Sequence, residues 1–433
     1  MFKTLKNAWK IPELKSKLLF TLLIVVLYRL GANIPVPYVS SDVGTSLNAM
    51  FGGSIFGYLN ILSGNAFANA TLFALGVNPY ITASIVMQLL TIAIPALERL
   101  SKEGEEGRKK ITSYTRYVTV GLGLITSYGY AMLLKANNML VADANTFSIV
   151  VIIACYCAGS ALVMWLAEKV NDHGIGNGIS VILFANIVAR GPAYISSIIN
   201  TITSKTGSVG SLILGIVLAI LSVAIFLAIV LVIVWMNDSE RRIPVQYAKR
   251  VVGRKMYGGQ GTNLPLKLNM TGVMPIIFAS SIVSIPATIG SFFPNSKFWT
   301  GVTNAFNYNT WLYVIIELIL LVAFAYFYVA ISFNPVEVAN NLKKQGGAIP
   351  GIRPGKPTSD YITRVLNRIT LIGAIILAFI CVFPMIVNII SKGSIADLAF
   401  SGSSIIIVIG VALETFRDLE AQMSLRNYKG FLD

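Results

Sequence analysis

The stretch GGSIFGYLNILSGNAFANATLFALGVNPYITASIVMQLL, from Gly52 to Leu90, has the composition of a membrane helix that is broken part of the way along. Its first part, Gly52 to Leu62, is shorter than the roughly 20 apolar residues that a membrane span requires. Its second part, Thr71 to Ile94, is long enough but carries polar side chains such as Asn78 and Gln88. Irregular backbone at membrane depth is tolerated only where protein buries it or where it lines an aqueous cavity. We therefore predict a re-entrant segment followed by a helix that lines a cavity.

Part of this stretch recurs further along the chain. Residues 76–84, GVNPYITAS, align without gaps with residues 272–280, GVMPIIFAS, and six of the nine positions are identical. A match of this length can arise by chance in apolar sequence, but a second one follows in the same order, between GISVIL at 178–183 and GSSIII at 402–407. Duplicated halves are common in membrane proteins that pass a substrate through their middle, with the working site between the repeats. The side chains that the pairing predicts to converge are Ile81, Leu183, Ile277 and Ile407.

The composition places the chain among membrane proteins. Of its 433 residues, 55% are hydrophobic and only 12% are charged, whereas soluble domains carry about 25% charged residues. We expect an all-α polytopic membrane protein with ten transmembrane helices. The predicted spans are 18–36, 72–94, 114–134, 147–168, 178–199, 211–236, 270–292, 311–333, 369–390 and 395–414.

The basic residues predict the orientation of these spans. Of the 34 Lys and Arg residues, 28 fall in the N-terminus, the C-terminus and alternate loops, and only 4 fall in the remaining loops. Basic residues stay on the cytoplasmic side of a membrane. Both termini are therefore predicted to be cytoplasmic, and the number of spans is predicted to be even. Residues 1–17 form a basic amphipathic segment that leads directly into a span, so we expect it to lie on the membrane surface and not to be a cleavable signal peptide.

The loop at residues 237–269 carries seven basic residues and has the pattern of a hairpin. Alternation around Val245, Tyr247, Val251 and Met256 predicts short strands with Gly253 at the turn. This arrangement would expose Arg254 and Lys255 at the tip.

The loop at residues 334–368 contains a glycine- and proline-rich turn, QGGAIPGIRPG at 345–355, that presents Arg353. Retention of basic residues on one side explains the charge of both long loops, but it does not explain their length or their turn residues, since a connector needs only a few residues. Such loops are suited to docking a phosphate-rich partner such as RNA, or an acidic protein surface.

No group of residues typical of an enzyme is found. The nearest approach to a phosphate-binding loop, PGIRPGKP at 350–357, lacks the required first glycine and the final Ser or Thr. His173 is the only histidine, and Cys155, Cys157 and Cys381 all lie in apolar spans, which predicts neither a disulfide nor a metal site. We expect no catalytic residue, no metal and no cofactor, so any work must be driven from outside the chain.

The alternative is a secondary transporter of a small solute. Such proteins mark their ion or substrate path with ionisable residues at mid-membrane. Few are present here, and most lie near span ends: Arg29, Arg190, Glu317, Asp397 and Glu414. The predicted centre is aliphatic instead, and a hydrophobic constriction of this kind can close around an arbitrary chain while excluding water and ions.

Eight short segments carry a resemblance to a known family. They are ALGVNPYITASI at 74–85, KEGEEGRKKI at 102–111, GIGNGIS at 174–180, YAKR at 247–250, LPLKLN at 264–269, IFASS at 277–281, FNP at 333–335 and PGIRPG at 350–355. Together they make the chain similar, over essentially its whole length, to the SecY family, the channel-forming subunits of the bacterial protein-secretion translocon.

The resemblance implies two pseudo-symmetric halves of five helices each, a re-entrant plug helix and long cytoplasmic loops. It divides the chain into a cytoplasmic N-terminus (1–17), an N-terminal half (18–200) with the plug at about 52–64, a C-terminal half (201–414) and a cytoplasmic tail (415–433).

The resemblance also implies roles for individual residues. The pore ring would consist of Val77, Ile81, Ile179, Leu183, Ile277 and Ile407, with Ile85 as a further candidate. The plug would include Gly52, Ile55, Phe56, Leu59, Ile61 and Leu62. The lateral gate would use Gln88, Ser280 and Ser281, and the docking surface would use Arg254, Lys255 and Arg353.

The activity implied is the passage of unfolded secretory polypeptides across the bacterial plasma (inner) membrane and the lateral release of hydrophobic segments into the bilayer. The partners implied are the SecE and SecG subunits, the SecA motor ATPase, the ribosome, signal sequences, unfolded preproteins and membrane lipid. DNA is not among them.

Overall fold

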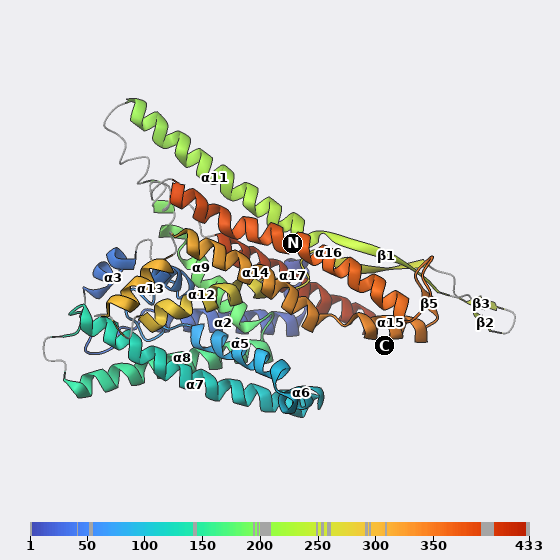
Figure 1. The fold of residues 1–433 in the computed structure, drawn as a ribbon, viewed down its shortest axis with the longest axis horizontal. Coiled ribbons are helices and arrows are strands. Elements are labelled where there is room, and N and C mark those ends of the chain that lie inside the picture. The colour runs from blue at the N-terminus through green and yellow to red at the C-terminus, as the bar shows by residue number, and fades with distance from the viewer. Residues whose placement is uncertain are drawn as a thin grey trace.

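The structure is a computed structural model, and it is built almost entirely of helices (Figure 1). It describes residues 2–40, 42–51, 55–141, 145–193, 195–196, 199, 209–247, 250–252, 255–257, 261–290, 293, 296–307, 310–390 and 402–429. The all-α fold expected from the composition is confirmed.

Five helices in the described part of the chain are long and apolar enough to cross a membrane. A sixth is obtained if α5 (Asn78–Ala93) and α6 (Pro95–Lys102), which are bent by 101° at their junction, count as one span. The chain is therefore a multi-pass membrane protein. The predicted number of ten spans is not tested by this criterion. Helices α9 (Gly178–Ala189) and α12 (Met274–Gly290) are only 12 and 17 residues long, and α2 (Pro12–Gly31) carries charged residues near both ends.

Two groups of five helices make up the bundle. The first group is α2 (Pro12–Gly31), α5 (Asn78–Ala93), α7 (Glu105–Ala136), α8 (Thr146–His173) and α9 (Gly178–Ala189). The second group is α11 (Val209–Asp238), α12 (Met274–Gly290), α14 (Trp311–Ser332), α16 (Lys356–Ile390) and α17 (Gly402–Lys429).

The two groups repeat the same pattern of packing. In the first, α5 packs on α7, α7 on α8, α8 on α9, and α9 on α2. In the second, α12 packs on α14, α14 on α16, α16 on α17, and α17 on α11. The groups then meet in two places, where α9 contacts α17 and where α5 contacts α12. The pseudo-symmetric halves expected from the repeats are confirmed by this order of contacts.

Two pairs of glycines occupy equivalent places in the halves. Gly76 and Gly272 both have positive φ, of 54° and 63°, and each lies two residues before a helix of the repeat, α5 or α12. Side chains other than glycine rarely adopt this backbone conformation. Gly178 and Gly402 begin α9 and α17, and each lies against a carbonyl of the preceding helix, that of Ala167 or of Ile380.

The shorter elements gather at the two ends of the bundle. One end, called the loop end here, carries α6 (Pro95–Lys102), α15 (Pro335–Lys344) and the strands of the described residues (Figure 1). The opposite end carries α3 (Val43–Phe51) and α13 (Lys297–Ala305). Helix α1 (Phe2–Lys10) packs against α2 and α17, and α4 (Ile55–Leu62) lies inside the bundle against α9 and α12.

A three-stranded sheet stands at the loop end. Its order is β4 (Gly261–Lys267), β1 (Glu240–Tyr247) and β5 (Gly347–Ala348), with both pairings antiparallel. The strands β2 (Arg250–Val252) and β3 (Lys255–Tyr257) form a separate antiparallel ribbon in which Val252 faces Lys255. The hairpin predicted from the alternating residues is confirmed for these strands, while Gly253 and Arg254 lie outside the described residues.

Substitution of Gly178 or Gly402, the glycines that begin α9 and α17, is expected to destabilise the bundle. A Cβ at Gly178 would lie 1.9 Å from the oxygen of Ala167, and a Cβ at Gly402 would lie 2.1 Å from the oxygen of Ile380. Because such overpacking forces backbone shifts that cost about 1–3 kcal/mol, Gly178→Ala and Gly402→Ala should each lower the unfolding midpoint temperature of the purified protein. Gly121→Ala is the control, since no atom lies within 4 Å of its added Cβ. Equal midpoints for all three variants would contradict the packing described.

Candidate functional site

The six residues of the predicted pore ring belong to the main apolar cluster at the centre of the bundle, which also takes in side chains of α2, α4, α8, α11, α14 and α16. Val77 directly precedes α5 and Ile81 lies in its first turns; Ile179 and Leu183 come from α9. Five of the six are buried and Ile179 is half-buried. The remaining two are Ile277 of α12 and Ile407 of α17, and the further candidate Ile85 is in the same cluster. The structure thus brings together the residues that the internal repeats paired, from both halves of the chain.

Helix α4 lies beside this cluster, where the plug was predicted. Leu62 is part of the cluster and Ile61 packs against it, whereas Leu59 packs against a second apolar cluster that includes Phe67. Gly52 and the side chains of Ile55 and Phe56 lie outside the described residues.

The end of α4 is held by polar side chains from the first half. The amide of Asn186 in α9 donates to the carbonyl of Leu62 at 2.7 Å and to the hydroxyl of Tyr28 at 2.9 Å. The guanidinium of Arg29 in α2 donates to the carbonyl of Gly64 at 3.3 Å, and also to carbonyls of α9. These bonds tie the end of α4 to α2 and α9.

The irregular backbone between α4 and α5 is also supplied with partners. The side-chain oxygen of Asn60 accepts from the amide of Ala68 at 3.0 Å, and the hydroxyl of Tyr156 donates to the carbonyl of Ala70 at 3.3 Å. The hydroxyl of Tyr130 donates to the carbonyl of Phe67. Unpaired backbone groups at membrane depth cost several kcal/mol each, on the order of a lost hydrogen bond or more. The prediction that this broken stretch is buried in protein is confirmed.

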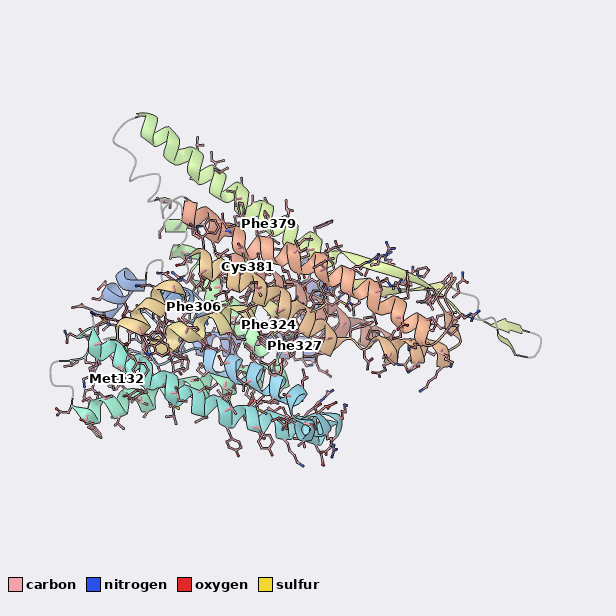
Figure 2. The ribbon with its side chains drawn as sticks, viewed as in Figure 1. Met132, Phe306, Phe324, Phe327, Phe379 and Cys381 are labelled. Carbon is pink, nitrogen blue, oxygen red and sulfur yellow. The ribbon has the colours of Figure 1, made fainter. Side chains whose placement is uncertain are left out.

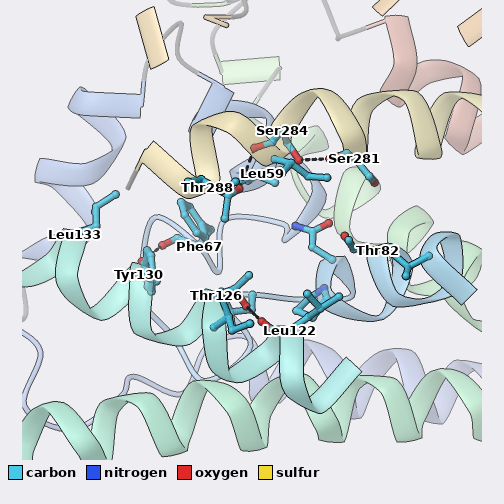
Figure 3. Close-up of a pocket in the computed structure, with 17 residues that line it drawn as sticks. Leu59, Phe67, Thr82, Leu122, Thr126, Tyr130, Leu133, Ser281, Ser284 and Thr288 are labelled. Atoms are coloured by element: carbon cyan, nitrogen blue, oxygen red, sulfur yellow. Dashed lines mark hydrogen bonds between the residues drawn. The ribbon is translucent and has the colours of Figure 1, made fainter. Parts of the chain in front are cut away.

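A seam separates the halves on one side of the bundle, and we define it as the contact of α5 and α7 with α12 and α14. It contains a cavity of about 390 Å³ with a predominantly apolar lining. Figure 3 shows Thr82 of α5 and Leu122, Thr126 and Tyr130 of α7 on one side of it, with Ser281, Ser284 and Thr288 of α12 on the other. The cavity extends to Leu59 of α4.

The three predicted gate residues take different positions around the seam. Ser281 lines the cavity, and Gln88 accepts a hydrogen bond across the seam from the hydroxyl of Tyr328 in α14 at 2.8 Å. Ser280 is buried and donates instead to the carboxyl of Glu317 in α14 at 3.0 Å. Ser280 therefore joins two helices of the same half.

The two long basic loops form one unit at the loop end. Strand β5 of the second loop pairs with β1 of the first, with Tyr247 opposite Gly347. A small apolar core lies beneath them and joins Ile243 and Leu266 of the first loop to Ile349 of the second. Arg353 is exposed next to this unit, and its carbonyl accepts from the hydroxyl of Thr358 at 2.8 Å. Lys255 begins β3, and its side chain lies outside the described part of the structure.

A second apolar hollow, of about 540 Å³, lies on the side of the bundle where α9 meets α17. It is lined by α2, α9 and α17, with Leu22, Phe184 and Phe416 among its residues. Arg29 is also among the residues that line it. We call this hollow the back groove.

The chemistry available at the centre of the bundle is that of a seal. Among the described residues, no three His, Cys, Asp or Glu side chains gather as a metal-binding group. The branched aliphatic side chains of the ring residues bind no ion and repel water, so they can close an opening.

Several polar residues of the site were not identified from the sequence. Arg29 and Glu317 stood out as charges within spans, which is a signal of function, but their partners could not be predicted. Asn186, Tyr130 and Tyr328 gave no signal beyond being polar groups in apolar helices. Their hydrogen-bond partners lie 63 to 240 residues away along the chain.

Comparison with known proteins gives consistent similarities. The family model described as SecY matches residues 71–416. The chain is 42% identical to the protein translocase subunit SecY of Streptomyces galbus and 44% identical to that of Streptomyces coelicolor, in each case over 447 aligned residues that cover all of both chains. The corresponding subunit of Mycobacterium tuberculosis is 42% identical over 452 residues, again with full coverage of both.

Solved structures show the same fold. A structure described as a protein-conducting channel aligns with a TM-score of 0.66 at 18% identity, and the alignment covers 94% of this chain and 92% of that one. Sec61 in a canine ribosome–channel complex from the endoplasmic reticulum aligns with a TM-score of 0.61 at 16% identity, with the same coverage.

Proposed function

The chain belongs to the SecY family, and on that premise we propose that it forms a protein-conducting channel in the bacterial plasma membrane. Unfolded secretory polypeptides pass through its centre, and hydrophobic segments leave sideways into the bilayer. The observation that carries the proposal is the central cluster, in which aliphatic side chains from four helices and both halves converge next to a short internal helix.

The central cluster suits the passage of an arbitrary polypeptide. Its ring residues, Val77, Ile81, Ile179, Leu183, Ile277 and Ile407, offer no charge and no fixed hydrogen bond, so they do not select a particular side chain. A flexible aliphatic constriction can fit closely around a chain and still exclude ions. The idle channel is closed by the same contacts between the halves.

Helix α4 acts as the plug in this account. It is short, it packs against both α9 and α12, and it is connected to α5 by irregular backbone. When the halves separate, α4 loses its apolar contact with the ring and can move. Asn186 and Arg29 keep its C-terminal end attached to the first half, which favours its return.

The seam provides the lateral gate. A hydrophobic segment that enters between α5 and α12 exchanges the apolar lining of the cavity for lipid as the gate opens. Ser281 and Gln88 lie along this path, and Ser280 stabilises the gate helix α12 from behind through Glu317. Such a path selects segments by their hydrophobicity, because apolar side chains are stable both against the lining of the cavity and in lipid.

The loop end is cytoplasmic in this account and receives the source of free energy, either the SecA motor ATPase or a translating ribosome. The paired loops supply a fixed support, and the exposed Arg353 together with Arg254 and Lys255 supplies positive charge for docking. The ribosome is supported as a partner by the Sec61 channel that was solved on a ribosome. Both termini of the chain then lie on the cytoplasmic side.

The back groove is the proposed binding site of the companion subunit SecE. It is open, apolar and built by α2, α9 and α17, so a single membrane helix placed there would cover the place where the two halves meet. SecG is proposed from family membership alone. No cofactor is assigned, and the alternative of a secondary transporter for a small solute is not favoured by the relatives.

Weakening the ring should make the idle channel leak. Ile81→Ser together with Ile277→Ser removes two buried aliphatic side chains, whose burial contributes about 1.5–3 kcal/mol each. We expect ion conductance through proteoliposomes that contain the complex, without substrate, to rise several-fold over that of the original chain.

The matched control replaces two isoleucines that face lipid. Ile372 and Ile375 in α16 are 53% and 55% exposed, so serine at both positions should leave the resting conductance unchanged. Equal conductance for the ring variant and this control would contradict the assignment of Ile81 and Ile277 to the ring.

Reversing the charge at Arg353 should impair docking without affecting the fold. Arg353 is exposed and only its backbone takes part in the local turn, so Arg353→Glu should insert into the membrane normally. Loss of a charged docking contact typically costs enough to reduce binding about tenfold or more, so secretion driven by SecA or the ribosome should fall by a similar factor.

Arg364→Glu is the control for this change, because Arg364 is also exposed but lies in α16 and not at the loop tip. Secretion should be near normal in that variant. Normal secretion in Arg353→Glu itself would exclude Arg353 from docking.

A further inference from the structure

A hydrogen bond crosses the seam near the loop end. The hydroxyl of Tyr328 in α14 donates to the side-chain oxygen of Gln88 in α5 at 2.8 Å. These residues are 240 positions apart and belong to different halves of the chain. The bond therefore joins the two bodies that must separate if the seam is to open.

Tyr328 is held firmly on its side of the seam. Its ring lies 5.0 Å from that of Phe278 in α12 and 6.0 Å from that of Phe327, measured between centroids, and Phe278 also contacts Phe324 at 6.1 Å. Figure 2 shows Phe324 and Phe327 close together on α14, and their ring centroids are 6.2 Å apart. The tyrosine is 9% exposed. Packing on several sides fixes where its hydroxyl points.

Gln88 is the more weakly held partner. Its amide nitrogen makes only a long contact, of 3.4 Å, with the hydroxyl of Ser84 one turn earlier in α5. Gln88 is exposed, whereas Tyr328 is buried, so it is the tyrosine hydroxyl that would carry most of its desolvation cost if it lost its partner. The pair is therefore more stable joined than separated, unless water or another polar group replaces the lost partner.

The position of the pair along the seam matters for entry. Gln88 lies toward the end of α5 that continues into α6, and Tyr328 lies toward the end of α14 that continues into α15, so both are near the loop end. The apolar cavity is lined by residues from the start of α5, such as Asn78, and from the later part of α12, such as Thr288. A segment that arrives from the loop end meets the hydrogen bond before it reaches the cavity.

We propose that Tyr328 and Gln88 form a latch that holds the seam shut at its cytoplasmic end, and that an entering hydrophobic segment must break this latch to reach the apolar cavity. Tyr328 acts here as a positioning residue, since it sets how readily the halves part. The inference rests on the proposed channel function and adds a residue that sets the threshold for opening.

The test uses Tyr328→Phe, which removes only the hydroxyl and keeps the aromatic packing with Phe278. The readout is export of a secretory protein whose signal sequence has a shortened apolar core, in cells where the variant is the only channel-forming subunit. Loss of one hydrogen bond of ordinary net strength should favour the open seam by about twofold to tenfold, and export of the defective precursor should rise by a similar factor.

Tyr326→Phe is the matched control. Tyr326 is on the same helix, and its hydroxyl also makes one hydrogen bond, to the carbonyl of Asn367 at 3.2 Å, but that bond stays within one half. Export of the defective precursor should be unchanged in this variant. Equal gains from Tyr326→Phe and Tyr328→Phe would overturn the proposal, because the effect would then not depend on the seam.

The pairing itself is tested with Gln88→Leu. That single change should also raise export of the defective precursor. The double variant with Tyr328→Phe should export no more than the stronger single variant, because an apolar pair then replaces the polar pair without leaving an unsatisfied group. Multiplying effects in the double variant would show that the two residues act separately and would overturn the latch.

A second readout does not depend on transport. In a complex whose three native cysteines have been replaced, a single cysteine at position 82, in the wall of the seam cavity, is labelled with a lipid-soluble maleimide in proteoliposomes without substrate. Tyr328→Phe should raise the labelling rate about twofold to tenfold, and Tyr326→Phe should not. If Tyr328→Phe speeds labelling but the chain transports no protein, the latch is supported and the channel function is rejected. If transport is normal and Tyr328→Phe changes neither labelling nor export of the defective precursor, the latch is rejected.

Discussion

The structure depends on one constraint, which is that backbone polar groups at membrane depth must find partners inside the protein. The stretch between α4 and α5 is not helical, so its backbone groups cannot be paired within a helix. Hydrogen bonds from Asn186, Tyr130 and Tyr156 reach the carbonyls of Leu62, Phe67 and Ala70. Because these donors come from α7, α8 and α9, the conformation of the broken segment depends on the helices of the first half that surround it. A short helix inside the bundle, next to the ring, is the result.

The sequence was sufficient to predict that this break exists and that protein encloses it, because glycine, asparagine and proline are poor residues to expose to lipid. The identity of the partners could not be predicted, since a hydrogen bond between residues more than 60 positions apart leaves no local pattern. Gln88 was expected at the gate only from the family resemblance, and its partner Tyr328 could not be predicted, because the two residues are 240 positions apart. Residue type marks a group that needs a partner, but only the packing of helices selects which partner it receives.

Periodicity and repetition were more informative. The matches of residues 76–84 with 272–280 and of 178–183 with 402–407 predicted the pairing of α5 with α12 and of α9 with α17, and the shared glycine conformations and packing order agree with it. The number of spans was harder to test, because helices that surround a central site can be short or carry charges. In the basic loops, the local strands were predictable from alternation, but the pairing of β5 with β1, which joins both loops into one unit, was not.

These features combine into one account of the molecule. In the proposed channel, the aliphatic ring closes the centre and α4 is tethered beside it. The seam is the side that opens, and the back groove lies on the side that stays joined. The most direct test places a single cysteine at position 81, in a chain otherwise free of cysteine, and crosslinks it to a secretory protein stalled in transit. The account predicts crosslinks that move to successive positions of the substrate as the stall point moves. Failure to crosslink at any stall point, together with protection of the cysteine by a small solute, would contradict it.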